Sequence, residues 1–292
     1  MNENHARVCP SPEWADHVRS DVLPSLTQHA DLGDDMLEID AEAAAKLAQK
    51  YADGNVTMEL KSAIIGRIGF AAAEEQELLT ARLPGEAGSA RDWAALPIVA
   101  HTTEFRAQQV QRLRAIASGQ EPEDFAEVDH TSDQLYQGYA ARPAGLVAQE
   151  SWRVAGELID GVESVSADDL LDPSRNPWLR GRQLWLQIVV RGFWHPTGHL
   201  ADYYLAHGQP DRAVAMTAHG LATASYLRAP DQARGMAGYN LACAQARAGR
   251  LDDAAAAVRD AVSRNPDLRG KAGSEPDLAM LRDSGCLDSV LA

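Results

Sequence analysis

Long hydrophobic runs are missing from this sequence of 292 residues. A membrane-spanning helix needs about 18 or more consecutive apolar residues, so no membrane span is expected. Basic residues are also scarce: 27 Lys and Arg stand against 42 Asp and Glu, which gives a net charge of −15. Such a charge repels a phosphate backbone, and we therefore expect no nucleic-acid partner.

Cysteine is equally scarce. The three cysteines, Cys9, Cys243 and Cys286, are far apart and form no Cys-x-x-Cys pair, which excludes a disulfide framework and a zinc ribbon. Cys243 falls on an apolar helix face and is expected to be a small core residue rather than a nucleophile. The first residues lack the basic head and apolar core of a secretory signal. Together these observations favour a cytoplasmic protein.

Aromatic residues make up only 6% of the chain, whereas Ala, Leu, Glu, Gln and Arg recur at spacings of three and four. This composition and spacing predict a mainly α fold. Four long amphipathic stretches with short connections are typical of an antiparallel four-helix bundle. They run from Met58 to Pro84, from about 93 to 118, from about 131 to 165 with a break at Pro143, and from 182 to 207.

Three regions follow from these patterns. Residues 1–57 form an appended segment, small and either irregular or α/β, residues 58–207 form the bundle, and residues 208–292 form helical hairpins with a C-terminal cap. The last region contains an internal repeat: residues 199–215 match residues 240–256 at a constant offset, and Gly208 and Gly249 coincide. A glycine at this point marks the turn between two helices.

The second copy of the repeat resembles a tetratricopeptide repeat, because its Leu-Ala pair, Gly249 and Pro266 have the spacing of that motif. Such repeats present a groove to another helix or tail. The resemblance therefore implies that residues 208–292 can dock a protein partner.

Three histidines are the main candidates for chemistry. His195 and His199 are four residues apart, so on a helix both rings can reach one metal ion, and His101 on the second predicted helix can supply a third ligand. Three imidazoles suit nickel, zinc, iron or manganese and leave open positions. The alternative is a set of hydrogen-bonded core histidines. Pro196 disfavours helical geometry at His195, so the helix either kinks or begins there.

Residues 58–207 resemble the DinB-like superfamily of four-helix bundles, which includes mycothiol- and bacillithiol-dependent enzymes. The resemblance rests on a tryptophan before VAHTTEF, on the two histidines of WHPTGHLADYY, and on the helix order. In that family one histidine of the second helix and two of the fourth hold a divalent metal, which implies His101, His195 and His199. It also implies a thiol cofactor, with mycothiol as the specific expectation, and a small electrophile as substrate.

Five further residues are candidates for the surroundings of this site. Glu104 and Asp202 could orient the histidines, and Glu150 could enter the bundle as a ligand or acid, although the favoured interpretation of each is a solvated charge. Trp194 and Tyr203 lie beside the histidine pair in the sequence and are candidate pocket residues.

The opening segment resembles the start of a class I S-adenosylmethionine methyltransferase, in which a helix such as SPEWADHVRSDVLPSL precedes a strand reading LEI. In that family the strand leads into a glycine-rich turn that approaches the cofactor. Here Ile39 is followed directly by Asp40 and a helical stretch. We therefore expect a truncated remnant or decoration that does not bind S-adenosylmethionine.

Two functions remain open from the sequence. The first is a metal- and thiol-dependent transferase or isomerase that acts on a small electrophile. The second is a non-catalytic protein for small-molecule binding or self-protection, with the repeat as a partner-docking surface. The sequence leaves open whether the chain forms a homodimer.

Overall fold

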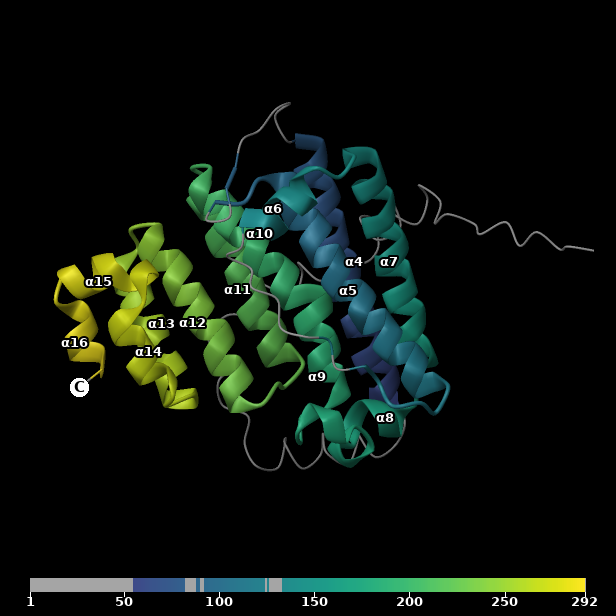
Figure 1. Ribbon diagram of the computed structural model, residues 1–292. Coiled ribbons are helices and arrows are strands. Elements are labelled where there is room, and N and C mark those ends of the chain that lie inside the picture. The colour runs from purple at the N-terminus through teal and green to yellow at the C-terminus, as the bar shows by residue number, and fades with distance from the viewer. Residues whose placement is uncertain (1–54, 82–87, 90–91, 124, 126–132, 292) are drawn as a thin grey trace, which may run out of the picture. The chain divides into compact units, whose positions relative to one another are not determined.

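The computed structural model describes residues 55–81, 88–89, 92–123, 125 and 133–291 (Figure 1). This part of the chain is mainly helical, which confirms the predicted fold class at that level. It contains no strand, only an isolated bridge between Ser89 and Asp92. None of its helices is both long and apolar enough to cross a membrane. The predicted methyltransferase-like segment, residues 1–57, lies outside the described residues except for its last three.

The chain divides into two units. One comprises the residues up to Glu86 together with Val99–Phe193, and the other comprises Ala87–Ile98 together with Trp194–Ala292. The helices are α4 (Asn55–Ala81), α5 (Ala95–Ala117), α6 (Asp133–Ala140), α7 (Ala144–Ser164), α8 (Ala167–Leu171), α9 (Leu184–Val189), the π-helical η5 (Val190–Trp194), α10 (His195–Ala206), α11 (Pro210–Tyr226), α12 (Asp231–Arg247), α13 (Leu251–Arg264), α14 (Leu268–Ser274), α15 (Ala279–Asp283) and α16 (Cys286–Leu291). Short 3-10 turns are η3 (Pro173–Arg175), η4 (Pro177–Leu179) and η6 (Pro276–Leu278).

The core of the first unit is built on α4, which packs against α7 and α9 (Figure 1). The predicted apolar stripe of α4 is buried, as is that of α7, which confirms both patterns. The stripe residues are Leu60, Ile64, Ile68, Ala72 and Leu79 in α4, and Val147, Val154, Leu158 and Val162 in α7. Burial of such side chains contributes about 1.5–3 kcal/mol each and fixes how these helices pack.

The break predicted at Pro143 is confirmed. α6 ends at Ala140, and Pro143 stands immediately before α7 with a φ of −63°. A proline at the start of a helix removes only a backbone N–H that would have had no partner within the helix. Pro143 therefore separates two helices that their hydrophobic pattern would otherwise join.

In the second unit, α10 packs against α11 and α12 packs against α13, so both copies of the repeat are helical hairpins. The glycine turns are confirmed: Gly208 and Gly249 have φ values of 70° and 77°, in the left-handed region that favours glycine. In each turn the next residue donates its N–H back to the ending helix, over 2.8 Å from Gln209 to Tyr204 and 2.9 Å from Arg250 to Gln245.

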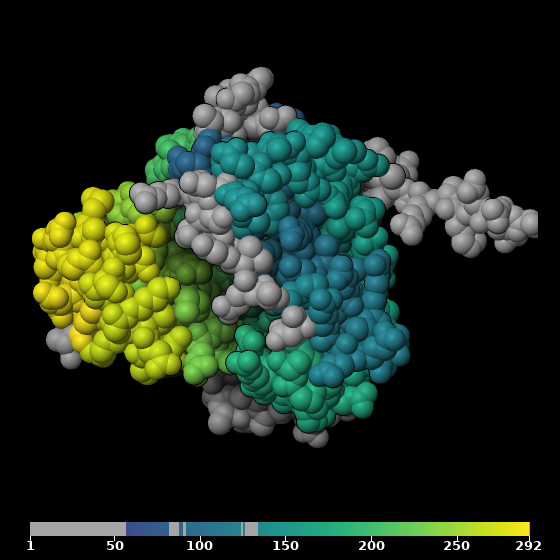
Figure 2. Space-filling view, in the orientation of Figure 1, coloured from purple at the N-terminus to yellow at the C-terminus, as the bar shows by residue number. Residues whose placement is uncertain are grey.

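Alanine side chains and Val258 fill the space between α12 and α13, and leucines that follow α13 complete this core. Its members include Ala242, Ala246, Ala254, Val258, Ala261, Leu268, Leu278, Leu281 and Leu287. Figure 2 shows the side chains of the C-terminal helices, drawn in yellow, forming one continuous surface over this part of the unit. Small side chains permit the close approach of the helices, so packing here is sensitive to added volume.

Gly235 of α12 gives a test of this close approach. A Cβ atom added there would lie 2.7 Å from Cβ of Asn265 and 2.9 Å from the carbonyl oxygen of Ala261. The second obstacle is backbone of the last turn of α13 and the first is the Cβ of the residue that follows this helix, so neither can move aside as a flexible side-chain end could. We therefore expect Gly235→Ala to lower the free energy of unfolding by about 1–3 kcal/mol. Urea denaturation of the full chain measures this value.

The matched control is Gly156→Ala in α7, where nothing lies within 4 Å of the added Cβ. Alanine is the better helix former, so this variant should be more stable by about 0.5–1 kcal/mol. Equal effects of the two substitutions would contradict the packing of α12 against the end of α13.

Candidate metal centre

His195 and His199 lie one turn apart near the start of α10, and their rings meet. The two Nε2 atoms are 3.1 Å apart, and the ring planes stand at 83° to each other. Nitrogen ligands on one ion are about 3.0–3.4 Å apart when each metal–nitrogen bond is about 2.1 Å long. The pair therefore has the separation that two imidazoles on a shared ion require.

The backbone before this pair is irregular. Val190–Trp194 is π-helical, and the α-helical pattern begins again at His195, with Pro196 in the first turn of α10. Pro196 has no N–H to donate to the preceding turn, which is a common cause of such a bulge. Helical backbone continues through this segment, because Val190 and Trp194 both have φ and ψ angles in the right-handed helical region. Pro196 is therefore accommodated by a π-helical insertion within a helix and not by a helix that begins at His195. Gly192 in the π segment allows close packing, since a Cβ there would lie 2.8 Å from Ile68.

His101 is fully buried in α5. Its ring contacts Phe105, at 4.7 Å between centroids, and the edge of Tyr139 from α6, at 5.6 Å. The hydroxyl of Tyr139 donates to Glu104 over 2.7 Å. Burial, and next this hydrogen bond, raise the pKa of Tyr139, so its phenol keeps its proton at all physiological pH values.

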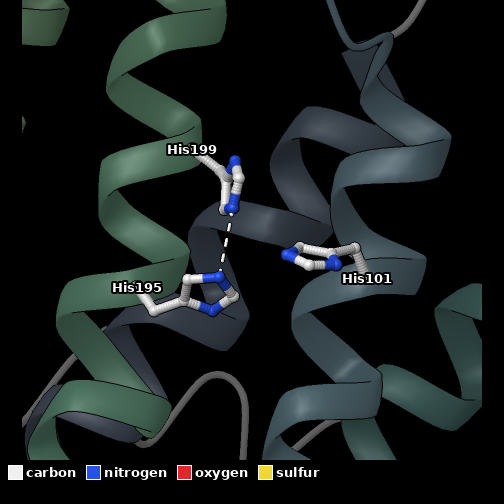
Figure 3. Close-up of side chains that lie close together, drawn as sticks. All are labelled: His101, His195 and His199. Atoms are coloured by element: carbon white, nitrogen blue, oxygen red, sulfur yellow. Dashed lines mark hydrogen bonds between the residues drawn. The ribbon is translucent and has the colours of Figure 1, made fainter. Parts of the chain in front are cut away.

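One potential ligand atom from each of His101, His195 and His199 lies within 4.8 Å of the others, and Figure 3 shows the three rings facing a common point. Among the residues described, this is the one group of metal-ligating side chains, and no carboxylate belongs to it. Three neutral imidazoles fit a divalent ion that keeps open positions.

Trp93, the tryptophan before VAHTTEF, was interpreted from the sequence as a packing residue, and its place beside the histidine pair was missed. Its ring stacks on His199, with centroids 6.0 Å apart and planes at 23°. Tyr139 beside His101 was also missed. Aromatic residues at these positions carry no spacing signal, because each arrives from a segment distant in the sequence from the histidine that it contacts.

The five other candidate residues have partners of their own. The carboxylate of Glu150 pairs with Arg142 and lies 3.9 Å from Arg153. Asp202 pairs with Arg247 over 3.0 Å, and its side chain is 67% exposed.

Trp194 and Tyr203 are likewise engaged within their own unit. The indole N–H of Trp194 donates to the carbonyl of Gly220 in α11 over 3.1 Å. Tyr203 is buried and stacks on His207, with centroids 3.9 Å apart. The first contact ties the end of η5 to α11, and the second lies within the C-terminal end of α10.

A buried polar network fixes α5 next to His101. Glu75 of α4 is fully buried and forms an ion pair with Arg106 of α5. It also accepts hydrogen bonds from Thr102, over 2.6 Å, and from Ser151 of α7, over 3.0 Å. Because Thr102 immediately follows His101, this network sets the position of that turn of α5 against α4 and α7.

The assignment of this site rests on the geometry of its own residues. The separation of the ring nitrogens is the direct observation, and the network around Glu75 explains why His101 is held in place. No protein-family model, no curated protein and no solved structure matches the chain.

Proposed function

We propose that His101, His195 and His199 bind one divalent metal ion, and that the protein joins a low-molecular-weight thiol of the mycothiol type to a small electrophile. The proximity of the three potential ligand atoms, within 4.8 Å, is the observation that carries the proposal. A DinB-like bundle over residues 58–207 and tetratricopeptide-like hairpins over residues 208–292 form the architectural part of the same proposal.

A divalent ion with open positions acidifies a thiol bound to it, so that a thiolate is available at neutral pH. In the proposed reaction the thiol proton leaves to solvent, and the sulfur forms a bond to one carbon of an activated alkene while the carbon–carbon π bond breaks. The electron pair of that π bond is then protonated by solvent at the other carbon, so the reaction is a net addition. Aromatic side chains hold the histidine rings in place: Trp93 limits the rotation of His199, and Phe105 and Tyr139 limit that of His101.

Elemental analysis of protein prepared without a histidine tag tests the metal site. We expect about one equivalent of nickel, zinc, iron or manganese in the wild type. Substitutions His101→Gln, His195→Gln and His199→Gln should each weaken binding by more than the roughly 10–100-fold that loss of a supporting residue costs. His219→Gln in α11 is the matched control, since His219 lies outside the group.

A wild type that binds no metal after reconstitution, or three variants that retain it, would overturn the site. If metal binds, consumption of the thiol in the presence of an electrophile such as an activated alkene decides the activity. Metal binding without thiol consumption would favour the non-catalytic alternative, a small-molecule binding or self-protection protein.

A further inference from the structure

Tyr139 connects the ring of His101 to the helix that carries it. The two rings are 5.6 Å apart between centroids, and their planes stand at 69° to each other. The hydroxyl of Tyr139 donates to Glu104 over 2.7 Å. Because Glu104 follows His101 by three residues in α5, the two side chains project from one side of that helix. Tyr139 therefore contacts α5 at two positions, once through its ring and once through its hydroxyl.

The backbone around Tyr139 is held as well. Tyr139 is buried and is the last residue but one of α6. Its carbonyl oxygen accepts a hydrogen bond from the N–H of Arg142 over 3.2 Å, and the side chain of Arg142 forms an ion pair with Glu150 of α7. The phenol of Tyr139 is thus fixed at its backbone and at its hydroxyl, which restricts movement of its ring away from His101.

The imidazole of His101 needs such a restriction in order to present one nitrogen in a fixed direction. Rotation about the bond between Cβ and the ring of a histidine has only a broad intrinsic preference, so neighbouring groups decide the angle. Phe105, one turn further along α5, contacts the His101 ring at 4.7 Å between centroids and an angle of 54°. With Tyr139, two aromatic rings at different angles limit the rotation of this imidazole.

The position of α5 itself has a separate cause. Thr102 and Arg106 bind Glu75 of α4 from another side of α5, because consecutive residues of a helix are about 100° apart around its axis. Removal of the Tyr139 hydroxyl leaves these bonds in place. An effect on the direction of the His101 ring can therefore be measured separately from an effect on the packing of α5.

We propose that Tyr139, held by its hydrogen bond to Glu104, is a positioning residue that sets the orientation of the His101 imidazole for metal binding. Tyr139 acts on the ligand and not on the ion. The inference rests on the metal site of the proposed function and adds a residue of α6 to it. Residues that orient a metal ligand typically contribute about 10–100-fold to metal affinity. Glu104, a candidate from the sequence, then orients a histidine through the phenol.

Competition with a chromophoric chelator measures the Kd of the full-length protein for Zn²⁺. Tyr139→Phe keeps the ring and removes the hydroxyl, and it should raise this Kd about tenfold or more. Glu104→Ala should act similarly, whereas Glu104→Gln keeps an oxygen acceptor and should stay within about threefold of the wild type. The double variant Tyr139→Phe with Glu104→Ala should bind no more weakly than the weaker single variant, because both changes remove the same hydrogen bond.

Tyr226→Phe in α11 removes a hydroxyl from an exposed tyrosine and should leave the Kd unchanged. The absorption spectrum of bound Co²⁺ gives a second readout, because it follows the geometry of the ligands, and Tyr139→Phe should change it. A wild type that binds no metal would overturn the proposed function and this inference together. If the wild type binds metal and Tyr139→Phe has the same Kd and Co²⁺ spectrum, only this inference fails, even where urea denaturation shows the variant to be less stable.

Discussion

Replacing Glu75 by alanine is expected to lower the free energy of unfolding by about 3–5 kcal/mol, because it leaves the buried guanidinium of Arg106 without its carboxylate. Thr102 and Ser151 also lose the acceptor of their hydrogen bonds. Urea denaturation, followed by far-UV circular dichroism, measures the loss.

The exposed ion pair between Arg153 and Glu157 of α7, at 2.7 Å, provides the control. Glu157→Ala should cost no more than about 0.5 kcal/mol. The double variant Glu75→Leu with Arg106→Met should be more stable than Glu75→Ala alone, because it removes both charges together. If Glu75→Ala costs no more than Glu157→Ala, the network does not hold α5 in place.

Cys243 is expected to react with iodoacetamide at pH 8 about a thousandfold more slowly than an ordinary exposed thiol. Burial, and then the carboxylates of Glu275 and Asp277, raise its pKa to about 12. Only the thiolate reacts, and each pH unit below the pKa reduces the thiolate fraction tenfold. Mass spectrometry of the labelled peptide gives the rate. The result would agree with the sequence-based prediction of a core residue.

The pH dependence separates the acidity of the thiol from its limited access. Labelling of Cys243 should still rise about tenfold per pH unit between pH 8 and pH 10, whereas labelling of an ordinary thiol levels off above its pKa of about 8.5. Cys286, which is also partly buried, serves as the internal comparison. A plateau for Cys243 below pH 10 would contradict the raised pKa.

Local patterns in the sequence were sufficient to predict most helices. The apolar spacing of α4 and α7, the break at Pro143 and the glycine turns at Gly208 and Gly249 act within a few residues, so each can be recognised without the fold. The histidine pair could be recognised in the same way, because a spacing of four residues brings two side chains together within a single helix.

The partners of these elements could not be predicted in the same way. Glu74, Glu75 and Glu77 lie close together in the sequence. Glu75 is distinguished as the core residue only by its position on the buried face of α4. The sequence itself places Glu75 on the apolar stripe of α4, because Glu75 lies seven residues after Ile68. A glutamate was nevertheless not expected in the core. Pairing of Glu75 with Arg106, and of Tyr139 with Glu104, depends on which helices become neighbours in three dimensions.

The length of the π-helical segment Val190–Trp194 determines the effect that a deletion within it would have. A π turn accommodates one residue more than an α turn, and one residue corresponds to about 100° of rotation around the axis. The direction of His195 and His199 is therefore set by the length of this segment as well as by its side chains. A deletion of one residue there would keep both histidines in the sequence and still turn them to another face.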